Sequence, residues 1–146
     1  MTLVSASAKP AGTTTFKFTV QAEHCNRLGN LHGGCTATIF DIATTSAIAP
    51  IAKPGFVRSY LTLILHWKQA NKISVKWAYA GVTRTLNVTF IRPVAKGEEI
   101  LIESTVIHAG KRLATMHGVI KRKSDGAVMA TCEHGKVSID PEVSKI

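Results

Sequence analysis

The chain has 146 residues, of which 45% are hydrophobic and 18% charged, and its formal net charge is +9 at pH 7. This length suits one domain with a continuous core, so residues 1–146 are expected to form a single domain. The longest uninterrupted apolar stretches fall well short of a membrane span, and the N-terminus lacks the basic and apolar segments of a secretory signal, so stable membrane insertion is not expected.

The first third of the chain predicts two strands and one long helix. Residues 2–8 and 14–23 are strand-like, and the turn-like AKPAGT separates them. After a loop at residues 22–31, the run GGCTATIFDIATTSAIA at residues 33–49 is apolar or small on nearly every side, and Pro50 ends it. A helix without a polar face must be covered all round, so we expect this helix at the centre of the fold.

The C-terminal half predicts a meander of strands. Four strand-like runs lie at residues 82–93, 98–109, 111–123 and 126–140, separated by the turn signals PVAKGE, HAGK and SDG. We expect these strands to pair antiparallel in sequence order. One buried helix with a long antiparallel sheet gives an α+β layout in which the sheet curls around the helix.

Charge and cysteine usage bear on partners and compartment. Four cations and no acid lie in residues 57–77. A second basic cluster surrounds a predicted hairpin and consists of Lys111, Arg112, Lys121, Arg122 and Lys123. These cations suit either a solvated face or contact with phosphates. Aromatic residues do not interleave with the second cluster, so a nucleic acid partner is not expected. Cys25, Cys35 and Cys132 lack a CxxC or Cys/His metal pattern. We therefore expect free thiols, no metal and an intracellular location, cytoplasmic or mitochondrial.

Gly33 and Gly34 stand where the predicted helix begins. A helix N-terminus leaves backbone N–H groups unpaired and carries the positive end of the helix dipole. Glycines there let a carbonyl oxygen or an oxyanion approach without a side chain in the way. A donor fixed where charge develops typically lowers an acyl-transfer barrier by about 3 to 4 kcal/mol. Turn glycines at a helix start are the simpler interpretation of this pair alone.

Asp41 is a carboxylate in the middle of the predicted central helix, where an unpaired charge is costly and is usually partnered or functional. It follows Gly33 by a rise of about 12 Å along a helix, so the two cannot grip the same carbonyl from one chain. If they cooperate, a second subunit brings its Asp41 to the first subunit's Gly33, with antiparallel helices across a two-fold axis. This predicts a homodimer with two composite sites.

Three stretches carry a resemblance to a known family: AEHCNRLGNLHGGCTATIFD, GVTRTLNVTFIRPVAKGEEILIESTVIHAGKRLA and GAVMATCEHGKV. They are similar to the hotdog-fold acyl-CoA thioesterases of the PaaI-like group, in particular its eukaryotic branch. The motif N-x-x-G-x-L-H-G-G, with an aspartate eight residues after the first glycine of the pair, is far more specific than HGG alone. The resemblance covers nearly the whole chain apart from residues 57–77. It implies a hotdog fold, a curved antiparallel sheet around a central helix, in a homodimer or a dimer of dimers.

The resemblance implies a catalytic role for four positions. Asn26 matches a residue that helps hold the catalytic loop and the substrate. Gly33 matches the residue whose N–H polarises the thioester carbonyl. Asp41 matches the carboxylate, donated by the facing subunit, that orients or deprotonates the attacking water. Thr83 falls where relatives commonly carry a serine that helps position this water, so the hydroxyl is kept and a methyl is added.

Three further residues are candidates for binding the substrate: His32, which matches the family's histidine before the glycines, Gly34 and Asn87. We expect Asn87 on the same strand face as Thr83, where it lines the acyl or pantetheine channel or makes a plain cross-strand hydrogen bond. Metal is not expected at His24 and His32, because no ligand spacing recurs. Three histidines on the predicted strands are expected at the surface or at strand ends: His108, His117 and His134.

The chemistry agrees with direct attack by water. Thioester hydrolysis needs a carbonyl activator, a water and a base, and the CoA thiolate leaves readily, so Gly33 and Asp41 could suffice. No GxSxG motif or convincing Ser/His/Asp set is present, which disfavours an acyl-enzyme. We therefore expect an acyl-CoA thioester hydrolase of lipid metabolism that acts on fatty or aryl acyl-CoA without a cofactor. The alternatives are a non-catalytic acyl-CoA-binding hotdog module, a hotdog dehydratase, or a thioesterase impaired by residues 57–77.

Residues 57–77 interrupt the resemblance. The segment VRSYLTLILHWKQANKISVKW contains both tryptophans and an apolar LTLIL run with flanking cations. It is either a genuine insertion, such as a hairpin, a lid or a membrane-touching loop, or the in-frame translation of a retained intron. Because it enters just before the strand that carries Thr83, we expect it to affect the site if it is translated.

Overall fold

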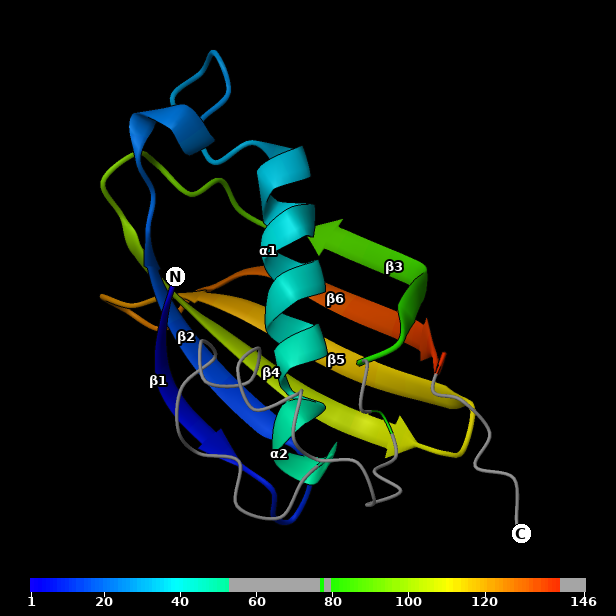
Figure 1. Ribbon diagram of the computed structural model, residues 1–146. Helices are drawn as coiled ribbons and strands as arrows, with labels where there is room; N and C mark the ends of the chain where they lie inside the picture. The colour runs from blue at the N-terminus through cyan, green and yellow to red at the C-terminus, as the bar shows by residue number, and fades with distance from the viewer. Residues whose placement is uncertain (53–76, 78–79, 140–146) are drawn as a thin grey trace, which may run out of the picture.

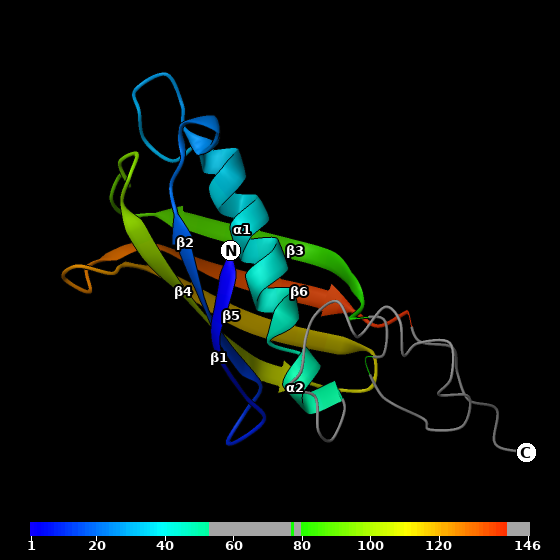
Figure 2. The same ribbon diagram turned by 60° about the vertical axis from the view of Figure 1, so that its left-hand side comes forward.

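Six antiparallel strands form one sheet, and a single long helix lies against one face of it (Figure 1). The computed structural model describes residues 1–52, 77 and 80–139. The elements are β1 Thr2–Ser7, β2 Thr13–Thr19, a 3-10 helix Ala22–His24, α1 Gly33–Ser46, α2 Ala49–Ala52, β3 Val82–Phe90, β4 Glu99–Ala109, β5 Leu113–Arg122 and β6 Val128–Val137. The sheet curves around α1 (Figure 2), which is the predicted α+β layout.

The strand order is β1-β2-β4-β5-β6-β3, so β1 and β3 lie at the two edges. The prediction that the last four strands pair in sequence order is wrong for β3, which pairs with β6 and sets Phe90 opposite Ala130. The connection at residues 91–98 is too long for a tight hairpin. It is also tied to the loop before α1, where the Leu31 N–H donates to the Val94 oxygen at 2.8 Å. The chain therefore leads from the edge strand to the centre of the sheet.

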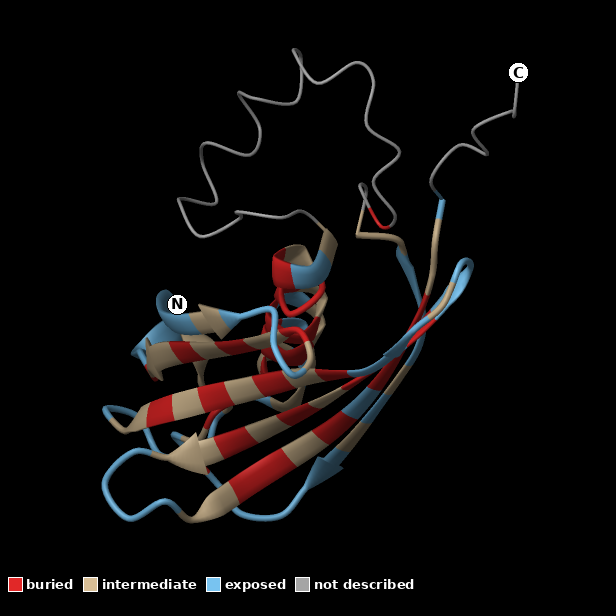
Figure 3. Ribbon diagram, turned by 90° about the horizontal axis from the view of Figure 1, so that it is seen from below, coloured by how far each residue is buried: buried red, intermediate tan, exposed pale blue. Residues whose placement is uncertain are grey.

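Buried and less buried residues alternate along the central strands (Figure 3), and the buried ones form an apolar core with Ile39, Phe40 and Ala43 of α1. On β4, Ser104 and the aliphatic residues Ile100, Ile102 and Val106 are buried, and the residues that alternate with them are less buried. Each such aliphatic side chain contributes about 1.5 to 3 kcal/mol when it leaves water. Gly118 on β5 lets the helix come close, because a Cβ at this position would lie 2.8 Å from a ring carbon of Phe40.

Trp77 belongs to the core of the protein. Its side chain is 4% exposed, and its indole N–H donates to the Gly110 oxygen at 3.0 Å. It joins a second apolar cluster at the C-terminal end of the helix, with Ala47, Ile48, Val106, Ala114 and Met116. The rest of the atypical segment, residues 57–76, lies outside the described residues. The last residue of that segment is therefore packed as part of the fold.

Within one chain, α1 is covered on one side only, and not all round as predicted. Ile39, Phe40 and Ala43 are buried toward the sheet, whereas the Asp41 side chain is 45% exposed and Ile42 is exposed. By length and composition, Gly33–Ala52 is apolar enough to cross a membrane. A core helix passes the same test, and half of this one is buried against its own sheet.

Candidate active site

His32 caps the start of α1 and orders the two glycines. Its Nδ1 accepts a hydrogen bond from the Gly34 N–H at 3.0 Å, so the Gly34 amide is already used. The Gly33 N–H makes no hydrogen bond to another described residue. A Cβ at Gly33 would have as its nearest neighbour a ring carbon of Phe90 at 3.4 Å, an ordinary contact distance, so a Cβ there would clash with no described residue. Of the two amides, that of Gly33 is the one available to an oxyanion.

Asn26 holds the loop that leads to this helix. Its Oδ1 accepts hydrogen bonds from the Leu28 N–H at 2.9 Å and the Asn30 N–H at 3.2 Å, and its own N–H donates to the Asn30 oxygen at 2.8 Å. The side-chain NH₂ of Asn26 makes no hydrogen bond to a described residue, so it takes no part in the hydrogen bonds that hold the loop. It is therefore the part of Asn26 available to a substrate.

A groove of about 470 Å³ runs past the start of α1. Its walls are mainly apolar, with a few polar groups near Gly33, as is usual where an apolar ligand must be oriented. The residues that line it are Asn26, Leu28, Asn30, Leu31, Gly33, Thr36, Phe90, Ile91, Arg92, Pro93, Val94, Ile120, Met129 and Ala130. A carbonyl at the Gly33 N–H would therefore have apolar surface beside it.

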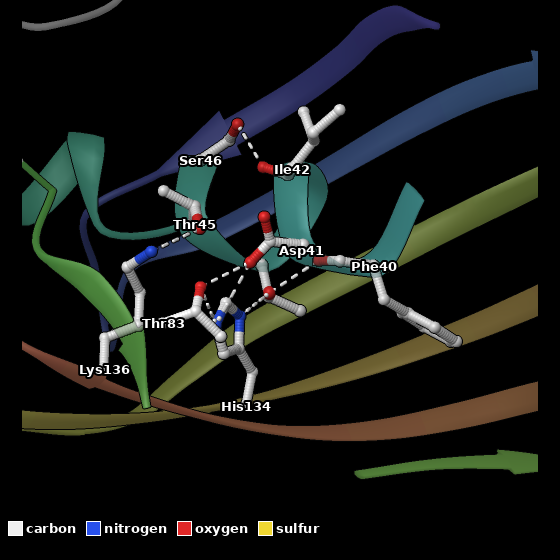
Figure 4. A network of polar contacts seen from close by, with 9 residues as sticks. Phe40, Asp41, Ile42, Thr45, Ser46, Thr83, His134 and Lys136 are labelled. Atoms are coloured by element: carbon white, nitrogen blue, oxygen red, sulfur yellow. Dashed lines mark hydrogen bonds and ion pairs between the residues drawn. The ribbon is translucent and has the colours of Figure 1, made fainter. Parts of the chain in front are cut away.

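Eight residues along α1, Asp41 meets the strand pair β3–β6 (Figure 4). The Thr83 hydroxyl donates to Asp41 Oδ1 at 2.6 Å, and the same hydroxyl lies 3.0 Å from His134 Nε2. His134 Nε2 is also 3.3 Å from Asp41 Oδ1. The structure thus brings together two predicted residues, Asp41 and Thr83, and adds a histidine.

His134 is fully buried, so its expected position at the surface or at a strand end is wrong. Its Nδ1 lies 2.6 Å from the hydroxyl of Thr44, one helical turn after Phe40, so both ring nitrogens have partners. Burial, with the nearby Lys136 ammonium, lowers the pKa of His134 to about 4, and Asp41 opposes this shift. The imidazole is therefore neutral at physiological pH.

The site has a second buried ionisable side chain in Lys136. Its Nζ donates to the Thr45 hydroxyl at 3.0 Å, and burial lowers its pKa from the ordinary value while Asp41 raises it (Figure 4). On the same strand face, burial raises the pKa of Cys132 to about 11, so this thiol stays protonated. The three cysteines are free, as predicted.

Asn87 does not share the strand face of Thr83, so that prediction is wrong. A bulge between Thr83 and Thr85 shifts the register of β3 against β6. Thr83 pairs with Lys136, which faces the helix, whereas Asn87 pairs with the exposed Glu133. One extra residue in a strand reverses the side on which all later side chains lie.

The basic cluster around the β5–β6 hairpin is engaged in ion pairs. Lys121 Nζ lies 2.7 Å from Glu103, and Lys123 Nζ lies 2.7 Å from Glu99. Arg122 pairs with Glu98 and Asp125, each at 3.1 Å. These three cations are therefore paired on a solvated face, which was one of the two interpretations of the cluster.

Comparison with known proteins identifies the family of the chain. The family model of the thioesterase superfamily matches residues 28–129, which include Gly33, Asp41 and Thr83. The chain belongs to the thioesterase superfamily.

Members of this superfamily match most of the chain. Human acyl-coenzyme A thioesterase 13 is 29% identical over 136 residues, which are 93% of this chain and 78% of the human protein. Zebrafish thioesterase superfamily member 2 superposes with a TM-score of 0.71 at 27% identity and covers 92% of this chain and 78% of its own. The mouse protein of the same name superposes with a TM-score of 0.70 at 30% identity, and the match covers 93% of this chain and 80% of the mouse chain. The hotdog fold implied by the resemblance is confirmed.

Proposed function

We propose that the protein is an acyl-CoA thioesterase that hydrolyses fatty or aryl acyl-CoA by direct attack of water. The observation that carries this proposal is the half-exposed Asp41 carboxylate, held by Thr83 beside a neutral, buried His134. Its acyl-CoA substrate follows the names of its relatives, among them acyl-coenzyme A thioesterase 13. The apolar groove beside Gly33 supports an acyl group as the part of the substrate bound there.

Each proposed step uses a group of the site. The thioester oxygen accepts a hydrogen bond from the Gly33 N–H, which stabilises the oxyanion of the tetrahedral intermediate. Asp41 takes a proton from water while the water oxygen forms a bond to the carbonyl carbon. The C–S bond then breaks, its electron pair leaves with the CoA sulfur, and the proton held by Asp41 passes to that sulfur. Asn26 and His32 orient the substrate.

We further propose that the site is shared between two subunits. Gly33 and Asp41 are about 12 Å apart along α1, too far for one carbonyl and its attacking water. β3, which carries Thr83, is an edge strand that exposes Phe90 to 58% and Val82 to 46%. A two-fold axis at this edge, perpendicular to the sheet, pairs two copies of β3 antiparallel and covers these side chains. An isologous dimer of this kind is the commonest oligomer. A dimer of dimers extends the same arrangement.

The substitution Asp41→Asn tests the reaction. We expect thiol release from acyl-CoA to fall by about 10² to 10⁴, because the amide cannot accept the water proton, while the folding transition stays in place. Thr83→Ser is the matched control, since it keeps the hydroxyl, and it should retain most of the activity. If the protein binds acyl-CoA without hydrolysing it, both with residues 57–76 present and with them deleted, it is a binding module and not an enzyme.

A further inference from the structure

Four short polar contacts follow one another through the site (Figure 4). The Phe40 carbonyl oxygen lies 2.6 Å from the Thr44 hydroxyl, which lies 2.6 Å from His134 Nδ1. His134 Nε2 lies 3.0 Å from the Thr83 hydroxyl, which lies 2.6 Å from Asp41 Oδ1. We call these five groups the polar series. Each of its four contacts needs one hydrogen to be a hydrogen bond.

The polar series has one hydrogen too few at rest. The hydroxyls of Thr44 and Thr83 supply one each, and a neutral His134 supplies one more, so three hydrogens serve four contacts. A hydrogen on Asp41 completes the series. Asp41 then donates to Thr83, Thr83 to His134 Nε2, His134 Nδ1 to Thr44, and Thr44 to the carbonyl of Phe40. Uptake of one proton therefore allows all four contacts to be hydrogen bonds at once. It requires at most a rotation of the exposed Asp41 carboxyl group.

Lys136 lies beside this series but is not a member of it. It is two residues after His134 on β6 and faces the same side, and its Nζ reaches Thr45, one helical turn after Asp41. The residue is only 4% exposed, and no carboxylate of a described residue lies within ion-pair distance of its ammonium. A buried ammonium held by a hydroxyl alone is costly. Its charge repels a second positive charge on His134.

We propose that Lys136 is a positioning residue of the reaction, whose buried ammonium keeps the polar series one proton short, so that the series is ready to accept the proton of the attacking water. This inference rests on the proposed thioesterase function. The O–H bond of water breaks, its proton binds Asp41, and the electron pair stays on the oxygen that attacks the thioester carbon. When the C–S bond breaks, the proton leaves Asp41 for the CoA sulfur and the series returns to its resting state.

Few charged groups face His134 in the described part of the chain. On β6 its neighbours on the same face are Cys132, which is a neutral thiol, and Lys136. On α1 the titratable groups are Asp41 and Cys35, a thiol whose pKa is raised by burial. The β5 residues that pair with positions 132, 134 and 136 are Gly118, Met116 and Ala114, and the β3 residues are Val88, Leu86 and Thr83. Lys136 is thus the only cation among the described groups that face His134, so substitution of Lys136 changes the charge near His134 without affecting another cation.

The test is the pH dependence of kcat/KM in Lys136→Met, Lys136→Arg and the matched control Thr45→Val. In the methionine variant the acidic limb of the profile should move to higher pH by about one unit, because the charge that opposes protonation is gone. Lys136→Arg and Thr45→Val keep a positive charge and should leave the limb in place. Lys136→Gln, which retains a donor to Thr45, replaces the methionine variant if the latter does not fold.

Equal loss of activity at every pH, with an unmoved limb, would overturn the proposal and leave Lys136 a structural residue. An NMR titration of the His134 ring in the unmodified protein and in Lys136→Met separates this outcome from failure of the proposed function, because it needs no turnover. A His134 titration that rises in the variant supports the role of Lys136 even in a protein without hydrolase activity. An identical titration in both proteins contradicts it.

Discussion

At the scale of single residues, His134 is the feature that sequence reasoning missed. Asp41 and Thr83 were predicted as site residues from the motif and its resemblance, and the structure brings them within hydrogen-bond distance. His134 stands in the run CEHGK, where polar residues occupy both faces of the strand, so alternation does not say which of them points inward. The period-2 placement of His134 between Cys132 and Lys136, both of them buried, is visible only once the strand register is known.

The buried neutral imidazole of His134 predicts an acid-sensitive fold. In the unfolded chain a histidine takes up its proton near pH 6.5, whereas the folded pKa is about 4. Between these values the unfolded state binds more protons, so stability is lost as the pH falls. We expect about 2 to 3 kcal/mol of the unfolding free energy to disappear from this residue between pH 7.5 and 4.5.

Urea unfolding at both pH values, at a fixed protein concentration, measures this loss. His134→Asn serves as the reference, because its remaining pH dependence comes from other groups. A wild-type protein whose unfolding free energy changes with pH no more than that of the variant would show that His134 is not held neutral by the fold.

At the scale of elements, the helix and the individual strands could be predicted but their order could not. The apolar run at residues 33–49 contains α1, and each predicted strand has a counterpart in the sheet. The pairing of β3 with β6 depends on the connection at residues 91–98, which is bonded to the loop before α1. These contacts join segments far apart in sequence, so no local pattern reports them. The same holds for the bulge that turns Asn87 away from the site.

Substitution of two glycines on facing elements should have different effects, a loss of stability at Gly118 and a loss of activity at Gly33. In Gly118→Ala the new Cβ would lie 2.8 to 3.0 Å from atoms of Phe40 and Thr44, so we expect a loss of about 1 to 3 kcal/mol in unfolding free energy. Gly33→Pro should keep the fold, because proline suits the first position of a helix and His32 before it is extended. It removes the N–H that stabilises the oxyanion, and kcat should fall by about 10² to 10³.

Thermal unfolding and thiol release, measured side by side on the two variants, check this pair. A Gly118→Ala protein as stable as the parent would contradict the close packing of α1 on β5. Full activity in folded Gly33→Pro would remove Gly33 from the site.

At the scale of the whole molecule, one chain presents the two parts of the proposed site about 12 Å apart, one at the start of α1 and the other beyond its middle. The Gly33 N–H and the groove lie at the helix start, and Asp41 lies beside the exposed edge strand β3. The sequence already requires this separation, because eight helical residues span about 12 Å. The partner that would close the gap is a second copy of the same chain. The proposed reaction therefore depends on sharing of the site between subunits.

Mixing two inactive variants tests this claim most directly. Asp41→Asn and Gly33→Pro, purified separately, should each release little thiol from acyl-CoA. If the variants are unfolded together and refolded, half of the dimers are mixed and each mixed dimer has one intact site, so about a quarter of the wild-type activity should return. Activity that stays at the level of the separate variants, while the refolded protein is dimeric, would show that Gly33 and Asp41 do not meet across a subunit interface.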